Sequence, residues 1–270
     1  TDPTLQPLLH INPSDAVRYI SFNMAIPPFD DVHVRKAINL GLDKAGMRTF
    51  RGGESVGEIA GHIMVNSLED NLLADYDPYA TPNSAGDLTA AQAEMAQSAY
   101  DTDGDGVCDA PECSNILAVT DEAAPYPDQA ALIQQNMEPL GLTFDVKSFE
   151  RTTMYSKCNE PEAHVAICLA PGWGKDFPDG YTFADPLFGS AAIFPSCCNY
   201  QLVGASADLL SEAGYDITEV PSVDDQIKTA NQQTGDARFQ AWADLDTTLM
   251  EQVVPWVPYL FDNNVDITST

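Results

Sequence analysis

Basic residues are scarce in this sequence. Its 270 residues include 12 lysines and arginines against 41 aspartates and glutamates, a formal net charge of −29. Nucleic acids and anionic membrane surfaces are bound through clustered lysine and arginine, so the composition argues against both as partners. No apolar run approaches the roughly 18 residues of a membrane-spanning helix, so no membrane insertion is predicted. The start, Thr1-Asp2-Pro3, lacks an initiator methionine and a basic, apolar leader, and we expect it to be mature or excised.

Catalytic signatures are also absent. The sequence has neither a G-x-S-x-G elbow nor an H-E-x-x-H motif. The four histidines are isolated along the chain, and we expect them on the surface or in loops: His10, His33, His62 and His164. His33 follows Asp30-Asp31 and is expected to make a local contact at the start of a helix. We therefore predict that the protein is not an enzyme.

Six cysteines indicate the redox compartment. None forms a paired C-x-x-C array, and their even number and close spacing favour disulfides in an oxidising, extracytoplasmic location. Reduced, buried cysteines are the alternative. The expected pairs, in decreasing order, are Cys108 with Cys113, Cys158 with Cys168, and the adjacent Cys197 and Cys198, which could instead pair elsewhere.

Hydrophobic periodicity predicts strands that alternate with helices, which indicates an α/β fold with a mixed sheet flanked by helices. Residues 1–10 should be irregular and 54–86 mostly loop. The last helix places Phe239, Trp242 and Leu245 at helical spacing, as a core-facing stripe. The strands are expected at 17–23, 115–120, 142–149 and 165–169, and the helices at 32–50, 88–100, 127–140, 152–157 and 236–252.

An acidic loop fits the calcium-binding pattern D-x-D-x-D-G-x5-E at every ligand position. Carboxylates two residues apart on a tight turn converge on one point, which suits a hard cation that takes six to eight oxygen ligands. A solvated turn without metal is the alternative. Because no second loop pairs with it, a bound calcium ion should be structural. The expected ligands are Asp101, Asp103, Asp105, the carbonyl of Val107, Asp109 and Glu112.

Three segments in order carry a family resemblance. Residues 18–38 contain Arg18-Tyr19-Ile20-Ser21-Phe22-Asn23, then a Pro-Phe-Asp turn and Arg35-Lys36-Ala37-Ile38. Residues 130–142 form a helix-to-strand join, and residues 172–179 read Gly-Trp-Gly-Lys-Asp-Phe-Pro-Asp. These segments resemble the oligopeptide/dipeptide-binding family of ABC-transporter solute-binding proteins, the bacterial extracellular solute-binding protein family 5.

The resemblance implies one lobe of a two-lobed, periplasmic-binding-protein-like fold. Residues 1–270 would be the second lobe, with 1–16 as lead-in or hinge and 101–113 as a calcium-loop insertion, and the first lobe would be missing. The implied function is to bind a solute, expected to be a peptide, and to deliver it to the permease of an ABC importer. The implied location is the periplasm or, through a lipid anchor, the cell surface. A calcium-stabilised extracellular adhesion or interaction module is the alternative.

The family pattern also implies ligand-binding residues. Asp176, three residues after Trp173, matches the acidic position that pairs with a peptide's α-ammonium in peptide-binding relatives, a charge-assisted hydrogen bond. Trp173 would wall the ligand or seal the loop onto the core. Asn199 and Tyr200 match polar positions of the family and would line the cleft. No arginine precedes the loop as a carboxylate clamp, and the family also binds nickel chelates and sugars, so the solute stays open.

Overall fold

The computed structural model describes residues 8–268, and within them seven strands form one mixed sheet. The strand order is β2-β7-β1-β5-β3-β4, with β6 also beside β1. β3 runs parallel to β4 and β5, whereas β1 is antiparallel to β5, β6 and β7. The strands are β1 (Leu9–Phe22), β2 (Gly57–Glu58), β3 (Ile116–Asp121), β4 (Phe144–Phe149), β5 (Ile167–Cys168), β6 (Gly172–Gly174) and β7 (Trp256–Ile267).

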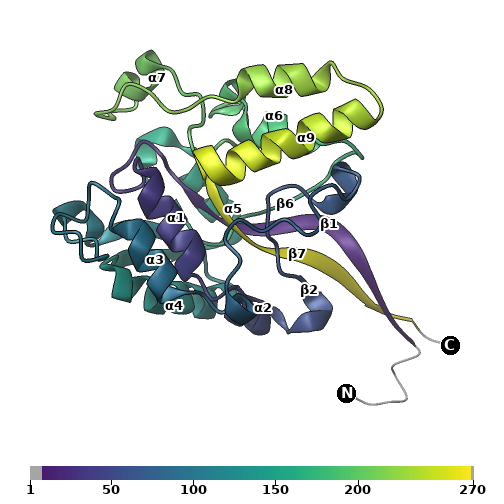
Figure 1. Ribbon diagram of the computed structural model, residues 1–270, viewed down its shortest axis with the longest axis horizontal. Helices are drawn as coiled ribbons and strands as arrows, with labels where there is room; N and C mark the ends of the chain where they lie inside the picture. Colours follow the sequence, from purple (N-terminus) through teal and green to yellow (C-terminus); the bar gives the residue numbers. More distant parts are fainter. Residues whose placement is uncertain (1–7, 269–270) are drawn as a thin grey trace.

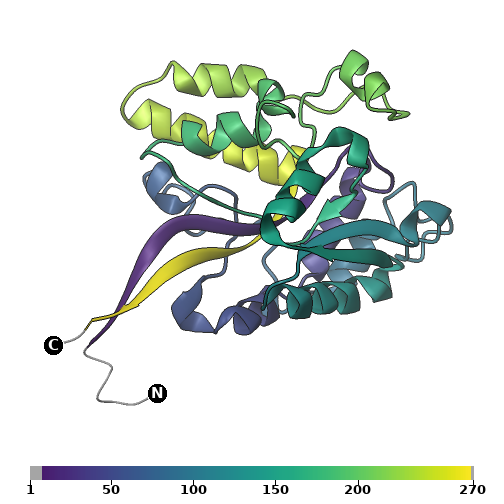
Figure 2. The ribbon, with the colours of Figure 1, turned by 180° about the vertical axis from the view of Figure 1, so that it is seen from behind.

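Helices cover the sheet from two sides (Figures 1 and 2). One group, α1 to α4, lies on the side opposite to α6, α8 and α9. No helix among residues 8–268 combines the length and the apolar character that crossing a membrane requires. The helices are α1 (Val32–Gly41), α2 (Lys44–Arg51), α3 (Leu88–Met95), α4 (Tyr126–Met137), α5 (Arg151–Asn159), α6 (Tyr181–Phe188), α7 (Ala207–Glu212), α8 (Asp224–Asn231) and α9 (Asp236–Thr248).

Strand β1 separates two hydrophobic clusters because its side chains alternate between the faces of the sheet. Val17 and Tyr19 belong to the cluster with α6 and α9, and the Tyr19 ring stacks on Trp256 with ring centroids 3.4 Å apart. Ile20 and Phe22 belong to the cluster beneath α1 to α4. The predicted strand 17–23 is therefore the centre of the protein, and the predicted mixed α/β sheet is confirmed.

Several predicted boundaries are corrected. The lead-in is not irregular from Leu9 onward: β1 begins there and pairs with β7 from Leu9–Ile267 inward, whereas residues 1–7 lie outside the described part. The expected helix 32–50 is two helices, because the Asp43 side chain accepts a hydrogen bond from the Gly46 N–H at 2.7 Å and starts α2. Helix α6, which contains Pro186, was not predicted.

The cysteine pairs agree with the expected ones: Cys108–Cys113, Cys158–Cys168 and the adjacent Cys197–Cys198 form disulfides. The histidine prediction is partly wrong. His33 does make local contacts, since its N–H donates to Asp31 and its Nδ1 lies 2.7 Å from Glu94 Oε1. His62 lies in a loop, as expected, but it is neither isolated nor at the surface, with 2% of its area exposed.

Candidate functional site

The Trp173 loop is fixed to the centre of the sheet. Strand β6 pairs with β1 so that Trp173 lies opposite Val17 and Gly172 opposite Arg18. The indole N–H of Trp173 donates to the carbonyl of Thr182 at 3.0 Å, and the ring packs partly buried against the α6–α9 cluster. Trp173 therefore seals the loop onto the core, one of the two roles expected of it, and it keeps a partly exposed face.

Asp176 projects from this loop as an exposed carboxylate. Its backbone N–H donates a hydrogen bond to Thr182 Oγ1 at 2.9 Å, which fixes the main chain. The carboxylate itself accepts only a long hydrogen bond, from the same Thr182 hydroxyl to Asp176 Oδ2 at 3.5 Å. The nearby cations are engaged elsewhere: Lys175 pairs with Asp15, and Arg238 pairs with Asp179. Among residues 8–268, Asp176 thus has no basic partner, although its loop is held in place.

Asp179, three residues further on, is the contrasting case. Its carboxylate receives two bonds from Arg238, at 2.5 and 2.7 Å, and one from the Tyr181 N–H. Burial alone would raise the pKa of Asp179, but these hydrogen bonds and the guanidinium charge lower it overall. Asp179 is therefore committed to holding the loop against α9, whereas Asp176 is not.

Asn199 and Tyr200 lie inside the protein. Asn199 is 1% exposed; its amide donates to the carbonyls of Gly189 and Val203 and accepts from the Val203 N–H. These bonds hold a turn, and the structure does not bring the Asn199 side chain to the Asp176 loop. Tyr200 is 8% exposed beside Tyr155, and burial raises the pKa of its hydroxyl. Their ligand-binding role stays a prediction that this arrangement does not favour.

A group of arginines near the carboxyl end of β3 was not predicted from the sequence. Three of the six arginines gather where β3 ends and α4 and α5 begin. The Arg51 and Arg151 guanidinium carbons lie 5.9 and 4.8 Å from the Tyr126 ring centre. A Cβ atom built on Gly172 would lie 2.5 Å from Arg18, so Arg18 lies directly against the start of the Trp173 loop.

Two aspartates pair with these three arginines. Arg18 Nε and Arg51 Nη2 reach Asp262 at 2.5 and 3.1 Å, and Arg151 Nε reaches Asp121 at 2.9 Å. Burial opposes the charge on Arg18, but Asp262 together with the nearby Tyr126 and Tyr259 raises the pKa of Arg18 overall. Ligands of open α/β sheets bind at the carboxyl ends of the strands, which is where this group lies. The sequence did not indicate this arginine group because its members are far apart along the chain, on β1, α2 and α5.

The acidic loop brings together only part of the predicted calcium ligands. Carboxylate oxygens of Asp101, Asp103 and Asp105 lie within 4.8 Å of one another. Asp101 accepts the N–H groups of Gly104 and Gly106, each at 2.7 Å, which curls the loop around it.

The later ligand positions of the loop are arranged differently. Asp109 accepts both the N–H and the hydroxyl of Thr102, and these bonds lower its pKa. Glu112 is exposed in a 3-10 turn, and neither residue joins the cluster of three aspartates. Val107 donates its N–H to Asp105 at 2.9 Å.

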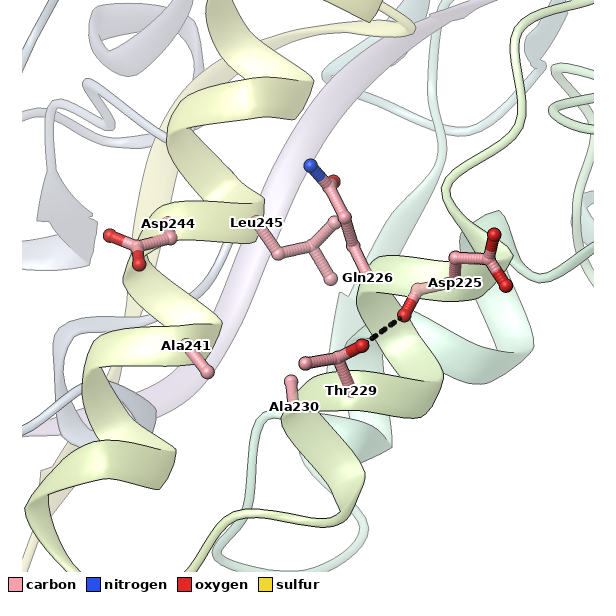
Figure 3. Close-up of a pocket in the computed structure, with 7 residues that line it drawn as sticks. All are labelled: Asp225, Gln226, Thr229, Ala230, Ala241, Asp244 and Leu245. Carbon is pink, nitrogen blue, oxygen red and sulfur yellow. Dashed lines mark hydrogen bonds between the residues drawn. The ribbon is translucent and has the colours of Figure 1, made fainter.

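A groove of about 330 Å³ between α8 and α9 is unrelated to this loop (Figure 3). Its walls include Asp225, Thr229 and Leu245, and the Thr229 hydroxyl is bound to the Asp225 carbonyl at 2.7 Å. No residue of the 172–179 loop lines it, and its charged lining residues are two aspartates, Asp225 and Asp244. The groove is therefore not the site that the sequence motifs predict.

Comparisons with known proteins agree with the motif. Residues 2–195 match the family model described as Bacterial extracellular solute-binding proteins, family 5 Middle. Heme-binding protein A of Haemophilus influenzae is 29% identical over 200 residues, which cover 72% of this chain and 32% of that protein.

Solved structures share the fold. Clavulanic acid biosynthesis oligopeptide binding protein 2 has a TM-score of 0.77 at 22% identity, over 97% of this chain and 44% of that one. The oligopeptide-binding protein AppA from Bacillus subtilis, solved with a nonapeptide, has a TM-score of 0.69 at 19% identity, over 95% and 47%. The chain thus spans less than half the length of these proteins, and it has their periplasmic-binding-protein-like fold.

Proposed function

Because the chain belongs to the bacterial extracellular solute-binding proteins of family 5, we propose that it is the second lobe of a two-lobed receptor that captures a peptide outside the cytoplasm. The receptor, in the periplasm or lipid-anchored at the cell surface, would hand the peptide to the permease of an ABC importer. The first lobe would close over the peptide from the other side. The lobe would bind the peptide without catalysing a reaction on it.

The observation that carries the proposal is the Asp176 carboxylate, exposed on a rigidly held loop and without a basic partner among residues 8–268. An unneutralised carboxylate gains most from a cation that arrives with the ligand, and a peptide's α-ammonium is such a cation. Closing a second lobe over the pair would exclude water and strengthen the bond.

The arginine group supports the other end of a peptide. Arg18, Arg51 and Arg151 exceed Asp121 and Asp262 by one positive charge. Arg151 is the most exposed of the three, with 35% of its side-chain area accessible, and it could receive a peptide carboxylate by a bidentate contact. The group stands next to Gly172, at the start of the Asp176 loop, so both charges of a short peptide would find a partner in this lobe.

The test uses the two-lobed protein and calorimetry with paired peptides, one free and one acetylated at its amino terminus. Asp176→Asn should weaken binding of the free peptide about 10- to 100-fold, the value of one charge-assisted hydrogen bond. It should leave the acetylated peptide unchanged. Asp216→Asn is the matched control, because Asp216 is exposed on a different loop.

Unchanged affinity of Asp176→Asn for the free peptide would show that Asp176 does not hold the ammonium. Heme belongs in the same screen, because the curated relative is named for it. A two-lobed protein that binds heme but no peptide would contradict the peptide assignment and retain the receptor function.

We further propose that Asp101, Asp103 and Asp105 hold a structural calcium ion, with Asp109, Glu112 and the Val107 carbonyl completing the site. The convergence of the first three carboxylates supports it. Asp109 would have to give up its bonds to Thr102, directly or through a water molecule. The loop occurs once within a solute-binding fold, which favours a structural ion over the alternative of a calcium-stabilised adhesion module.

A further inference from the structure

A buried cluster of one histidine and two carboxylates lies apart from both sites described above. His62 comes from the loop after β2, Glu69 follows a 3-10 turn, and Asp246 comes from α9. Their exposed fractions are 2%, 0% and 0%. One ligating atom from each lies within 4.8 Å of those of the other two. Buried carboxylates are rare unless they are paired or bind a metal, so this cluster requires an explanation.

The hydrogen bonds fix which histidine nitrogen faces the carboxylates. His62 Nε2 lies 3.1 Å from Asn66 Oδ1, an acceptor, which favours a proton on Nε2. His62 Nδ1 then faces Asp246 Oδ2 at 3.1 Å and Glu69 Oε2 at 3.8 Å. These three atoms are all electron-pair donors in their unprotonated forms. A proton or a metal ion is therefore needed among them.

Glu69 lacks any other partner. Neither of its carboxylate oxygens accepts a hydrogen bond from residues 8–268, although both are buried. Asp246 differs, because it also accepts the N–H groups of Ile63 at 3.1 Å and Met64 at 2.7 Å. Glu69 therefore places at least one free oxygen, Oε2, in the cluster, 3.8 Å from His62 Nδ1.

The spacing suits a small divalent metal. Bonds of about 2.0 to 2.2 Å at tetrahedral angles put two zinc ligands about 3.3 to 3.6 Å apart. The separations of 3.1 and 3.8 Å from His62 Nδ1 lie on either side of this range, so movements of a few tenths of an ångström would bring these two pairs into it. Asn66 would act as the partner that orients a metal-bound histidine through its other nitrogen.

We propose that His62, Glu69 and Asp246 form a binding site for a divalent transition metal such as zinc. One imidazole and two carboxylates suit zinc and its neighbours better than calcium, which takes oxygen ligands. Charge favours entry: His62 and Asn66 line a cavity of about 230 Å³ whose wall also includes Glu58, Asp75 and Asp77. The metal would join the loop after β2 to α9, across 184 residues of sequence.

The experiment uses the chain stripped with chelator and titrated with zinc, with calcium in excess so that the acidic loop is saturated. We expect one zinc per chain and a rise in melting temperature of roughly 5 to 10 °C at a hundredfold excess over the Kd. Cobalt in place of zinc should give the intense visible absorption of a tetrahedral site with nitrogen and oxygen ligands.

Glu69→Gln keeps the shape of the side chain and removes its negative charge, so the variant should fold and bind zinc at least tenfold more weakly. The matched controls are His10→Gln, which removes an exposed histidine, and the triple variant Asp101→Asn, Asp103→Asn, Asp105→Asn; both should retain the zinc stoichiometry. If Glu69→Gln does not fold, the cobalt spectrum of the wild-type chain decides. The proposal is overturned if the stripped chain binds no zinc, if cobalt gives no tetrahedral spectrum, or if Glu69→Gln binds zinc as tightly as wild type. None of these outcomes depends on peptide binding.

Discussion

Replacing Arg35 with methionine should destabilise the protein by about 3 kcal/mol. Arg35 is 3% exposed and donates to three backbone carbonyls: Nη1 to Phe29 at 2.5 Å, Nη2 to Val253 at 2.8 Å and Nε to Val254 at 3.1 Å. These bonds tie the first turn of α1 to the end of the π-helical turn Leu249–Val253. Burial lowers the pKa of Arg35 to about 10, so the guanidinium is still charged and donating at neutral pH.

Two effects oppose each other in this variant. Losing three hydrogen bonds from a charged donor costs about 1.5 to 3 kcal/mol each. Removing the buried charge returns about 3.4 kcal/mol, the equivalent of a pKa lowered from 12.5 to about 10. The hydrogen bonds outweigh the charge, and the middle of the range is a loss of about 3 kcal/mol.

Urea unfolding followed by tryptophan fluorescence measures this loss, because Trp242 and Trp256 are fully buried. Arg35→Lys keeps the charge without the fork of donors, so it should be no more stable than Arg35→Met. Lys36→Met, on the next and half-buried position, should stay within about 0.5 kcal/mol of wild type. An Arg35→Met protein as stable as wild type would refute the reasoning.

The remaining predictions concern calcium and pH. Relative to millimolar calcium, removing the ion from the acidic loop should lower stability by about 1 to 2 kcal/mol, a few degrees in melting temperature. The triple variant Asp101→Asn, Asp103→Asn, Asp105→Asn should lose this dependence of the melting temperature on calcium. A wild-type melting temperature that chelator does not change would exclude the ion. Asp179 has a lowered pKa in the folded state, so its contribution of about 1 kcal/mol is present above pH 4 and lost as pH falls through that lowered value. The stability difference between wild type and Asp179→Asn, measured by urea titration, should therefore shrink below pH 4; a constant difference would contradict the assignment.

Local patterns predicted the parts of the fold that local forces determine. The alternation at 17–23 identified β1, and the acidic spacing identified a loop in which Asp101, Asp103 and Asp105 converge. The first half of β1 was not recognised, because Pro13 and Asp15 interrupt its alternation. Its strand conformation depends instead on pairing with β7, more than 240 residues later in the register Asn12–Asn264.

The candidate sites show the same limit. The Trp173–Asp176 motif was readable because its four residues are contiguous, and the structure adds that Asp176 alone of its loop's acidic residues is unpaired within residues 8–268. Asn199 was predicted from its motif position, which does not show that its side-chain amide donates to two backbone carbonyls of a buried turn. His62 appeared isolated because Asp246, its partner at 3.1 Å, is on another element entirely. Side chains that meet only after folding leave no local pattern.

The pairing of β1 with β7 also decides how the lobe responds to force. The first residues of β1 and the last of β7 lie side by side at one end of the ribbon, with Leu9 opposite Ile267 (Figure 1). Pulling these ends apart loads the backbone hydrogen bonds one rung at a time, as in a zipper, instead of shearing all rungs together. Most residues of the outer rungs are exposed or half-buried, whereas most of those beyond Val17 are buried. A small displacement at the ends would therefore be absorbed by the outer ribbon, and the sheet that carries the Asp176 loop would remain undisturbed.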